Sequence, residues 1–509
     1  MSNSGSIVAL ATDKDELYEA HIDTSQVDES RLLRKIDIRV VPWLGLLYFL
    51  NFLDRGSIGN AKLYHMETDL GITDKQYLIA LTAFFFPYAL LEPASNVILR
   101  RVRPSMWLSS MMFVWGIVMM CHGFIHNYGG LVTLRVLLGV AEAGLYPGIV
   151  FYISCWYKRS ELGTRVAAFF TSATIAGAFS GLLAAAISNM NGVAGKPGWS
   201  WIFILEGLLT VLCAVASYWV ISNFPETAGF LTKEERVFVI RRLRDDMQFS
   251  AGGEEFKARY IWQSLRDWKT YLAMGIYMGF DGPLFAFSLF TPTIINEVLF
   301  DQSPGYTATT ANLLSVPVYI WSCIVTVIVG FVGDRLGRRG YINLCATSYM
   351  FEFRAIDLPG LVGYIILITS RTPGLSYFAC FLASSAWVAS NVEGSYKRGV
   401  TLAMAIGWGN LNGAVSSNVY RARDAPWYRL GHGIILAYIA IGWLSSAAFM
   451  ILLRRENERR DRGERDEVIN SDNSGEEMNE MALKNGRFET VNDARREKGD
   501  EWSQFRYTL

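Results

Sequence analysis

Apolar residues in this chain fall into runs of about twenty, and charged residues gather in the connections between the runs. A run of that length is what an α-helix needs to cross the hydrocarbon core of a bilayer. Spans are predicted at about 40–60, 76–98, 106–125, 130–152, 166–188 and 200–221, and again at about 270–292, 308–332, 341–370, 375–390, 400–420 and 432–453. The pattern predicts an all-α membrane protein with 12 nominal transmembrane helices in two six-helix halves, residues 39–221 and 269–453.

Three polar segments complete the predicted organisation. Residues 1–38 and 454–509 are rich in charged and small polar residues, and we expect disordered cytosolic tails there. Residues 222–268 form a charged cytosolic linker between the halves. Within it, Leu231–Asp246 has helix-forming residues and a capping box that begins at Thr232, which predicts a surface helix.

The basic residues favour one orientation in the membrane. They gather in the second, fourth and eighth connections and in the linker, whereas the connection at 126–130 has neither lysine nor arginine. Arg421, Arg423 and Arg429, in the last outer connection, run against this pattern, but earlier helices can overrule a short late loop. The positive-inside rule therefore predicts that both termini and the linker are cytosolic. We expect a multi-pass protein of the plasma membrane.

The ninth and tenth predicted spans are irregular. Residues 351–360 put three charged residues and Pro359 where a lipid-embedded helix should run. The tenth span offers only 378–390 as apolar helix, about 20 Å against a hydrocarbon core of about 30 Å. The ninth span thus contains inserted residues, and the tenth span beside it lacks residues. This combination indicates either a gene-model error or a damaged allele, and a damaged allele would encode a non-functional variant.

Composition narrows the classes of function. Lysine plus arginine and aspartate plus glutamate both number 47, so net charge gives no support to a nucleic-acid partner. The 6 cysteines are scattered without a metal-ligand spacing and are expected to be buried free thiols. The sequence also shows no nucleophile–base pair and no phosphate-binding loop. We therefore expect no enzymatic activity, no metal and no cofactor.

Two charges lie inside the fourth predicted span. Arg135 and Glu142 are about two helical turns apart and so share one face. A charge at membrane depth costs about 2.5–3.5 kcal/mol on insertion-based scales, so such residues line a cavity, meet partners or act in transport. Counting about 1.5 Å per residue puts Asp54 of the first span at the depth of Arg135, which permits an ion pair between them. The alternative is that these charges only lock helices together.

The eighth connection carries a motif that reads Gly330-Phe-Val-Gly-Asp334-Arg335-Leu-Gly337-Arg338-Arg339. It resembles G-x-x-x-D-[RK]-x-G-[RK]-[RK], the cytosolic loop of the major facilitator superfamily, and this resemblance implies the major facilitator fold. Asp334 at a helix end can pair with an arginine or a helix N-terminus, and the glycines permit a tight turn. The matched residues are expected to form a conformational gate; the alternative is a basic loop that only fixes topology.

Further motifs resemble one branch of that superfamily, the anion:cation symporters, in the fungal allantoate and nicotinate permease family. They are Asn51-Phe-Leu-Asp54-Arg55, Arg135 with Glu142-Ala-Gly and Pro147-Gly148, Trp156-Tyr157, and Gly407-Trp-Gly-Asn410-Leu-Asn-Gly413. The resemblance implies that Asp54 and Glu142 take part in proton coupling, that Arg135 pairs with Asp54, and that Arg55 contacts a substrate carboxylate. We add Asn51 and Asn410 to the expected substrate-binding residues.

Three polar residues of the second half are open between two interpretations. Asp281 precedes Gly282-Pro283 and either faces the cavity or relieves the backbone break at the proline. Asn410 and Asn412 either contact a substrate ring or serve close helix packing beside neighbouring glycines.

The sequence thus predicts a secondary active transporter that works by alternating access. We expect a monomer in the lipid bilayer whose partners are protons and a small organic anion, of the nicotinate, allantoate or pantothenate type. Proton-coupled uptake is the first hypothesis. Export of an acidic metabolite is the second, because the same charges permit it and a sequence does not set the direction of transport.

Overall fold

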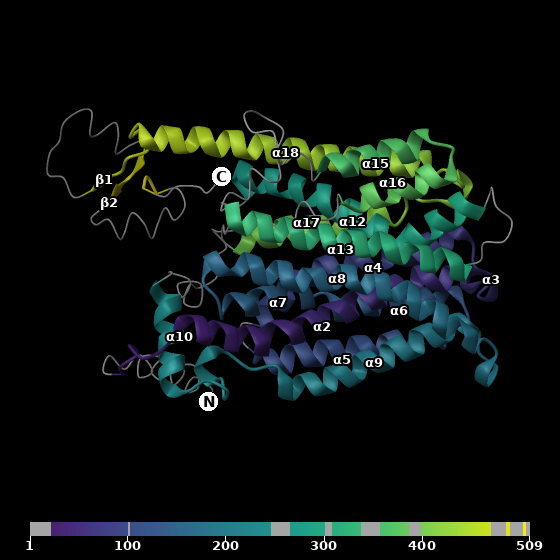
Figure 1. The fold of residues 1–509 in the computed structure, drawn as a ribbon, viewed down its shortest axis with the longest axis horizontal. Coiled ribbons are helices and arrows are strands. Elements are labelled where there is room, and N and C mark those ends of the chain that lie inside the picture. Colours follow the sequence, from purple (N-terminus) through teal and green to yellow (C-terminus); the bar gives the residue numbers. More distant parts are fainter. Residues whose placement is uncertain are drawn as a thin grey trace.

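The computed structural model describes residues 22–99, 102–245, 265–300, 308–336, 357–385, 399–469, 485–488 and 502–504. Long helices with similar directions make up most of it, with the first half of the chain below and the second half above in Figure 1. Among the described residues, 7 helices are long and apolar enough to cross a membrane. The predicted all-α membrane fold is confirmed.

The first half is a group of long helices joined by short connections. They are α2 (Glu29–Leu63), α4 (Asp74–Leu99), α5 (Pro104–His122), α6 (Tyr128–Glu142), α7 (Leu145–Ser154), α8 (Arg159–Ile187) and α9 (Gly198–Val220). The connections hold α3 (Met66–Asp69), η1 (Ser188–Met190), η2 (Val193–Gly195) and η3 (Pro225–Thr227). The span predicted at about 130–152 is divided into α6 and α7. At this break Gly144 packs so closely that a Cβ would lie 1.6 Å from Ser95 Oγ, so a larger residue would require Ser95 to move.

Helix α2 begins well before the span predicted at about 40–60. Asp28 caps it by accepting hydrogen bonds from the backbone N–H groups of Ser30 and Arg31 at 2.9 and 3.3 Å. Leu32 and Ile36 in the added turns are buried. The disorder expected over residues 1–38 is therefore wrong from Glu29 onward, because a cap and an apolar face stabilise the helix.

The linker contains α10 (Lys233–Asp245), in agreement with the predicted surface helix. It lies at the end of the molecule where α2 begins (Figure 1), which we call the linker end; the opposite end is the far end. Lys35 of α2 pairs with Glu235 of α10 at 2.7 Å. Partial burial raises the pKa of Glu235, but the hydrogen bonds from Lys35 and from the Thr232 N–H outweigh it and hold that pKa below its usual value.

The second half contains α12 (Trp268–Phe300), α13 (Ala308–Leu336), α15 (Asp357–Thr369), α16 (Pro373–Ser385), α17 (Gly399–Ser416), η5 (Ala422–Asp424) and α18 (Arg429–Asp461). Helices α15 and α16 are described over 13 residues each, about 20 Å of helix. These are the spans predicted to be irregular. The charged residues 351–356 and the stretch 386–398 lie outside the described residues.

Helix α18 continues past the predicted end of its span at about 453. Residues of opposite charge one turn apart support the extension, with Arg454 Nε 3.2 Å from a Glu458 oxygen. Beyond the helix, β1 (Val468–Ile469) pairs in parallel with β2 (Arg487–Phe488). The tail expected to be disordered from residue 454 is thus partly helix and strand.

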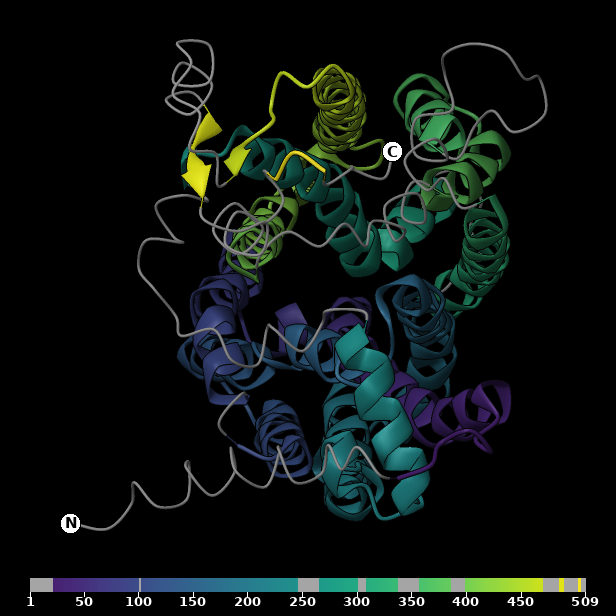
Figure 2. The same ribbon diagram turned by 90° about the vertical axis from the view of Figure 1, so that its left-hand side faces the viewer.

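The two halves meet along three seams, α2 with α12, α4 with α17 and α8 with α13. Figure 2 looks along the helices and shows the halves as two groups. In the first seam Gly59 lies so close to α12 that a Cβ would be 2.6 Å from Leu289 O. On the outside, large apolar side chains such as Leu90 and Trp219 are 78% and 76% exposed, a surface suited to lipid.

Candidate functional site

The centre of the first half holds a buried ion pair. Asn51 and Arg55 are one turn apart on α2, and both point to Glu142 at the end of α6. Arg55 Nε donates to Glu142 Oε2 at 3.1 Å, and Asn51 Nδ2 donates to the same oxygen at 2.9 Å. Arg55 is 8% exposed and Glu142 is fully buried. The structure therefore brings together three of the predicted site residues, and a charged guanidinium is tolerated there because a carboxylate faces it.

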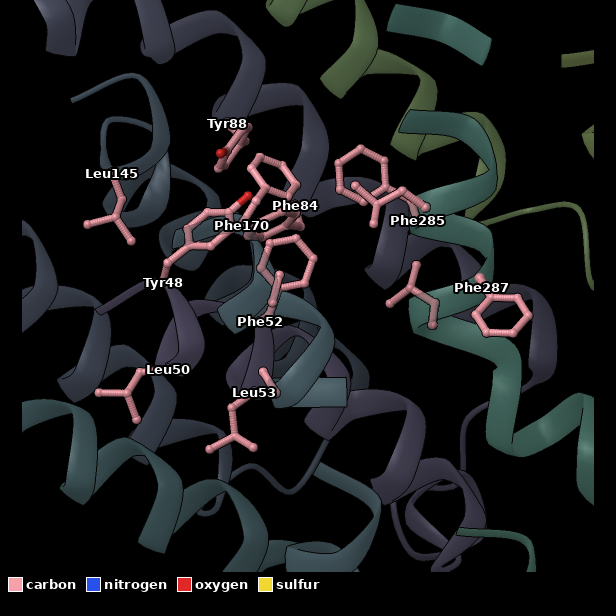
Figure 3. Packing of buried hydrophobic residues seen from close by; sticks show 14 of the residues in the cluster. Tyr48, Leu50, Phe52, Leu53, Phe84, Tyr88, Leu145, Phe170, Phe285 and Phe287 are labelled. Atoms are coloured by element: carbon pink, nitrogen blue, oxygen red, sulfur yellow. The ribbon is translucent and has the colours of Figure 1, made fainter. Parts of the chain in front are cut away.

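Aromatic rings surround the Arg55 guanidinium. Its Cζ lies 5.5, 5.3 and 4.9 Å from the ring centroids of Phe52, Phe84 and Tyr88, and 5.7 Å from that of Phe285 on α12. Figure 3 shows the four rings within one cluster of buried side chains. Rings at these distances attract a cation through their faces. Because Phe285 belongs to the second half, the Arg55 surroundings are shared by both halves.

Asp54 lies on a different face of α2 and meets α9. Thr210 Oγ1 donates to Asp54 Oδ2 at 3.0 Å, and one turn further along α2 the Ser57 hydroxyl bonds to Glu206. The second oxygen of each carboxyl group, Asp54 Oδ1 and Glu206 Oε1, is buried and accepts no hydrogen bond from the described residues. This face of α2 thus holds two buried carboxyl groups joined to hydroxyls, and neither forms an ion pair within the described part of the chain.

The expected ion pair between Arg135 and Asp54 does not form in this structure. Arg135 is 3% exposed, and its guanidinium lies 5.2 Å from the Phe84 ring, where its Nε has no hydrogen-bond partner among the described residues. The cause is helix packing, since a Cβ on Gly139, one turn along α6, would lie 2.2 Å from Phe84 O. Close contact of α6 with α4 directs Arg135 to α4, while Asp54 turns to α9.

The second half contributes asparagines and an aspartate. Asn410 Nδ2 donates to Glu92 Oε2 across the seam between α17 and α4 at 2.7 Å. Asn412 Nδ2 donates to Trp408 O of its own helix at 2.7 Å, which favours a packing role for Asn412. Asp281 on α12 is 7% exposed, and no hydrogen bond or ion pair joins it to the described residues.

Sequence reasoning missed two buried carboxyl groups, Glu92 and Glu206, each 1% exposed. The available signal was a glutamate inside an apolar run, the same signal that identified Glu142. Glu92 belongs with the site because it holds Asn410, and Glu206 belongs with Asp54.

The predicted gate is only partly within the described residues. Gly330, Asp334 and Arg335 lie in the last turns of α13, near the linker end. Gly337, Arg338 and Arg339 lie outside the described residues.

Polar contacts between the halves gather at the far end. Asn418 Nδ2 donates to Thr82 Oγ1 at 2.7 Å, Ala422 N donates to Asp74 Oδ2 at 3.2 Å, and Asn312 Nδ2 donates to Tyr64 OH at 3.2 Å. These residues lie where α2 ends and α4 begins, opposite the linker end. The structure thus describes a conformation in which the halves are joined at the far end.

Comparison with known proteins agrees with this architecture. Residues 44–450 match the family model described as Major Facilitator Superfamily. The chain is 34% identical over 485 residues to the MFS-type transporter cnsO of Penicillium expansum, with 90% of each chain covered. It is 28% identical over 466 residues to a high-affinity nicotinic acid transporter of Saccharomyces cerevisiae, with 89% of this chain and 83% of the relative covered.

A solved structure has the same fold. It is a bacterial homolog of the human lysosomal transporter Spinster in an inward-facing and unoccupied conformation, with a TM-score of 0.56 and 13% identity over 81% of this chain and 97% of that one. The family match covers most of the sequence, and the arrangement of helices is the one the family model implies. This chain belongs to the Major Facilitator Superfamily and is a membrane transporter.

Proposed function

We propose that this transporter couples proton movement to the uptake of a small aromatic carboxylate across the plasma membrane, as a monomer with both termini in the cytosol. The observation that carries the proposal is the Arg55–Glu142 pair, a buried cation at the seam between the halves whose carboxylate partner is part of the protein. Substrate and Glu142 then compete for the same guanidinium.

The chemistry of that competition links the proton to the anion. When Glu142 takes up a proton, Arg55 loses the charge that balances it, and a substrate carboxylate can supply the balance through the planar fork of the guanidinium. When the substrate leaves, Glu142 releases its proton and pairs again with Arg55. One buried positive charge thus keeps one negative partner at every step, which avoids the several kcal/mol that an unpaired buried ion costs.

The surroundings of Arg55 indicate the shape of the substrate. Phe52, Phe84, Tyr88 and Phe285 present ring surfaces around the guanidinium, which suit a flat acid better than a branched one. A relative is named a high-affinity nicotinic acid transporter, and this supports nicotinate as the first acid to test. Allantoate and pantothenate are the next.

Alternating access would then require the far-end contacts to open. Thr82–Asn418 and Asp74–Ala422 join the halves at that end, so the described conformation would face the cytosol. We propose that the motif at the end of α13, including Asp334 and Arg335, closes the linker end in the opposite conformation.

Uptake by purified protein in liposomes tests the proposal. An inwardly directed proton gradient should drive accumulation of labelled nicotinate, and a protonophore should abolish it. Glu142→Gln should still exchange substrate across the membrane but should no longer accumulate it with the gradient. Gradient-driven loss of substrate from the liposome lumen, by protein of known orientation, would support export instead.

Absence of movement of every acid in a panel of nicotinate, allantoate and pantothenate would contradict the proposal. Uptake that ignores the proton gradient would contradict the coupling.

A further inference from the structure

Asp281 is a buried acid that has no hydrogen-bond or ion-pair partner among the described residues. It lies on α12 in the second half and is 7% exposed, yet it forms no hydrogen bond or ion pair with the described residues. Its carboxylate lies over Gly409 of α17, where a Cβ would be 1.8 Å from Oδ2. A glycine at this position therefore leaves room for the carboxylate at the surface between α12 and α17. A buried acid in such a place calls for a donor or a cation.

Asp281 interacts electrostatically with the acid Glu92 of α4, and the cation that it interacts with is Arg55. The two do not form an ion pair in the described structure, and they belong to opposite halves. Phe285 fixes their relation, because Arg55 Cζ is 5.7 Å from its ring and Asp281 is one turn before it on α12, about 6 Å along the helix. Arg55 and Asp281 thus approach the seam between α2 and α12 from opposite halves; Phe285 contacts the first and lies one turn from the second.

The charges near the seam do not suit a simple anion. Arg55 is already balanced by Glu142, and Glu92 accepts a hydrogen bond from Asn410. A plain carboxylate that takes the place of Glu142 on Arg55 would still leave Asp281 without a donor or a cation. A ligand with a positive nitrogen across a ring from its carboxylate would satisfy both residues.

On the basis of the proposed function, we infer that the substrate is a dipolar acid, a flat carboxylate that carries a cationic nitrogen, with the carboxylate on Arg55 and the nitrogen on Asp281. Such a ligand contacts both halves of the transporter. It would draw α12 towards α2 and so favour closure of the seam around itself, a step that a ligand held by Arg55 alone could not promote.

Two acids of one shape test the inference. In 1-methylnicotinate a cationic ring nitrogen carries the methyl group, and in 3-methylbenzoate a neutral ring carbon carries it at the same place. Binding to the full-length protein in detergent should favour 1-methylnicotinate by at least about 10-fold, or about 1.4 kcal/mol. Asp281→Asn should abolish this preference and leave the affinity for 3-methylbenzoate unchanged or higher.

The variant to compare with Asp281→Asn is Arg55→Lys. It should weaken binding of both acids and leave the ratio of their affinities unchanged. Retained binding of 3-methylbenzoate by Asp281→Asn shows that this variant is folded. Equal affinity of the wild-type protein for the two acids, with both dependent on Arg55, would overturn the dipolar substrate and leave the proposed function standing. An unchanged preference in Asp281→Asn would also overturn it. Failure of the wild-type protein to bind either acid, or nicotinate, would overturn the proposed function together with the inference.

Discussion

Two faces of α2 bury polar groups in opposite ways. One face carries Asn51 and Arg55, which hold Glu142 in an ion pair among aromatic rings. The other carries Asp54 and Ser57, which meet α9, where Asp54 and Glu206 are acids without a cationic partner among the described residues. We call these the ionic face and the acid face. Only a rotation about the helix axis separates them, since Asp54 and Arg55 are consecutive.

The difference shows how one helix can handle two kinds of charge. On the ionic face, Arg55 and Glu142 balance each other's charge in the described conformation, which offsets the cost of burying the two groups. On the acid face, two ionised carboxylates would repel each other without compensation, so at least one must hold a proton. We therefore expect the ionic face to select the anion and the acid face to store a proton.

Arg55→Lys should have the largest effect and should break the ionic face. Lysine keeps the charge but lacks the planar fork that bonds Glu142 and the flat surface that stacks among four rings. We expect kcat/KM for uptake to fall by about 100-fold, or about 2.7 kcal/mol. Initial rates of uptake in liposomes over a range of substrate concentrations measure it.

Arg135→Lys is the matched control for that experiment. Arg135 is also buried, but it contacts the Phe84 ring and forms no ion pair among the described residues. We expect a loss of about 10-fold or less from the weaker cation–π contact. A larger loss in Arg135→Lys than in Arg55→Lys would contradict the placement of the anion on the ionic face.

The contrast between the two arginines also shows what a sequence can and cannot predict here. The bounds of several helices agree with the apolar runs, as in α5 and α9, because the thickness of the bilayer sets the length of both. The depth of a residue along its helix follows from the same arithmetic, and it placed Asp54 and Arg135 at one level. The depth of a residue does not determine the direction in which its side chain points around the helix axis. That direction decides that Asp54 contacts Thr210 and that Arg135 contacts Phe84.

For a similar reason, the sequence could not predict which residues on distant helices bond to these polar side chains. Glu206 could be recognised as a glutamate inside an apolar run, but its bond to Ser57 depends on how α9 packs against α2. Asn410 was predicted to bind substrate, and the structure adds a partner that the sequence did not reveal, because its amide donates to Glu92 across the seam between α4 and α17. A sequence can identify charged and amide groups inside membrane spans, but which of them pair with one another required the packed structure.

Glu206→Gln should have an intermediate effect and should separate the two faces functionally. Glutamine can still bond Ser57, so the fold and the ionic face should be intact, but it holds no exchangeable proton. We expect substrate affinity within about twofold of wild type and gradient-driven accumulation reduced by about 10-fold, or about 1.4 kcal/mol of coupling.

Asp54→Asn is the partner of that variant on α2. Because the two acids lie in one network, the double variant should lose little more than either single one. Additive losses in the double variant would show that Asp54 and Glu206 are two independent proton sites. If Glu206→Gln accumulates substrate as well as the wild-type protein does, the acid face has a structural role and no role in proton coupling.

Thr210→Val should have the smallest effect and should sharpen the description of the acid face. Valine has nearly the shape of threonine but removes the hydroxyl that donates to Asp54 Oδ2 at 3.0 Å. Loss of one buried hydrogen bond should lower the free energy of unfolding by about 1–3 kcal/mol, measured as a lower Tm in detergent. Thr369→Val is the control, since Thr369 is exposed and its hydroxyl donates to carbonyls of its own helix, Ile365 O at 2.8 Å and Ile366 O at 3.5 Å. Equal Tm values for the two variants would mean that Asp54 finds another donor, and the acid face would then be less dependent on α9 than its geometry indicates.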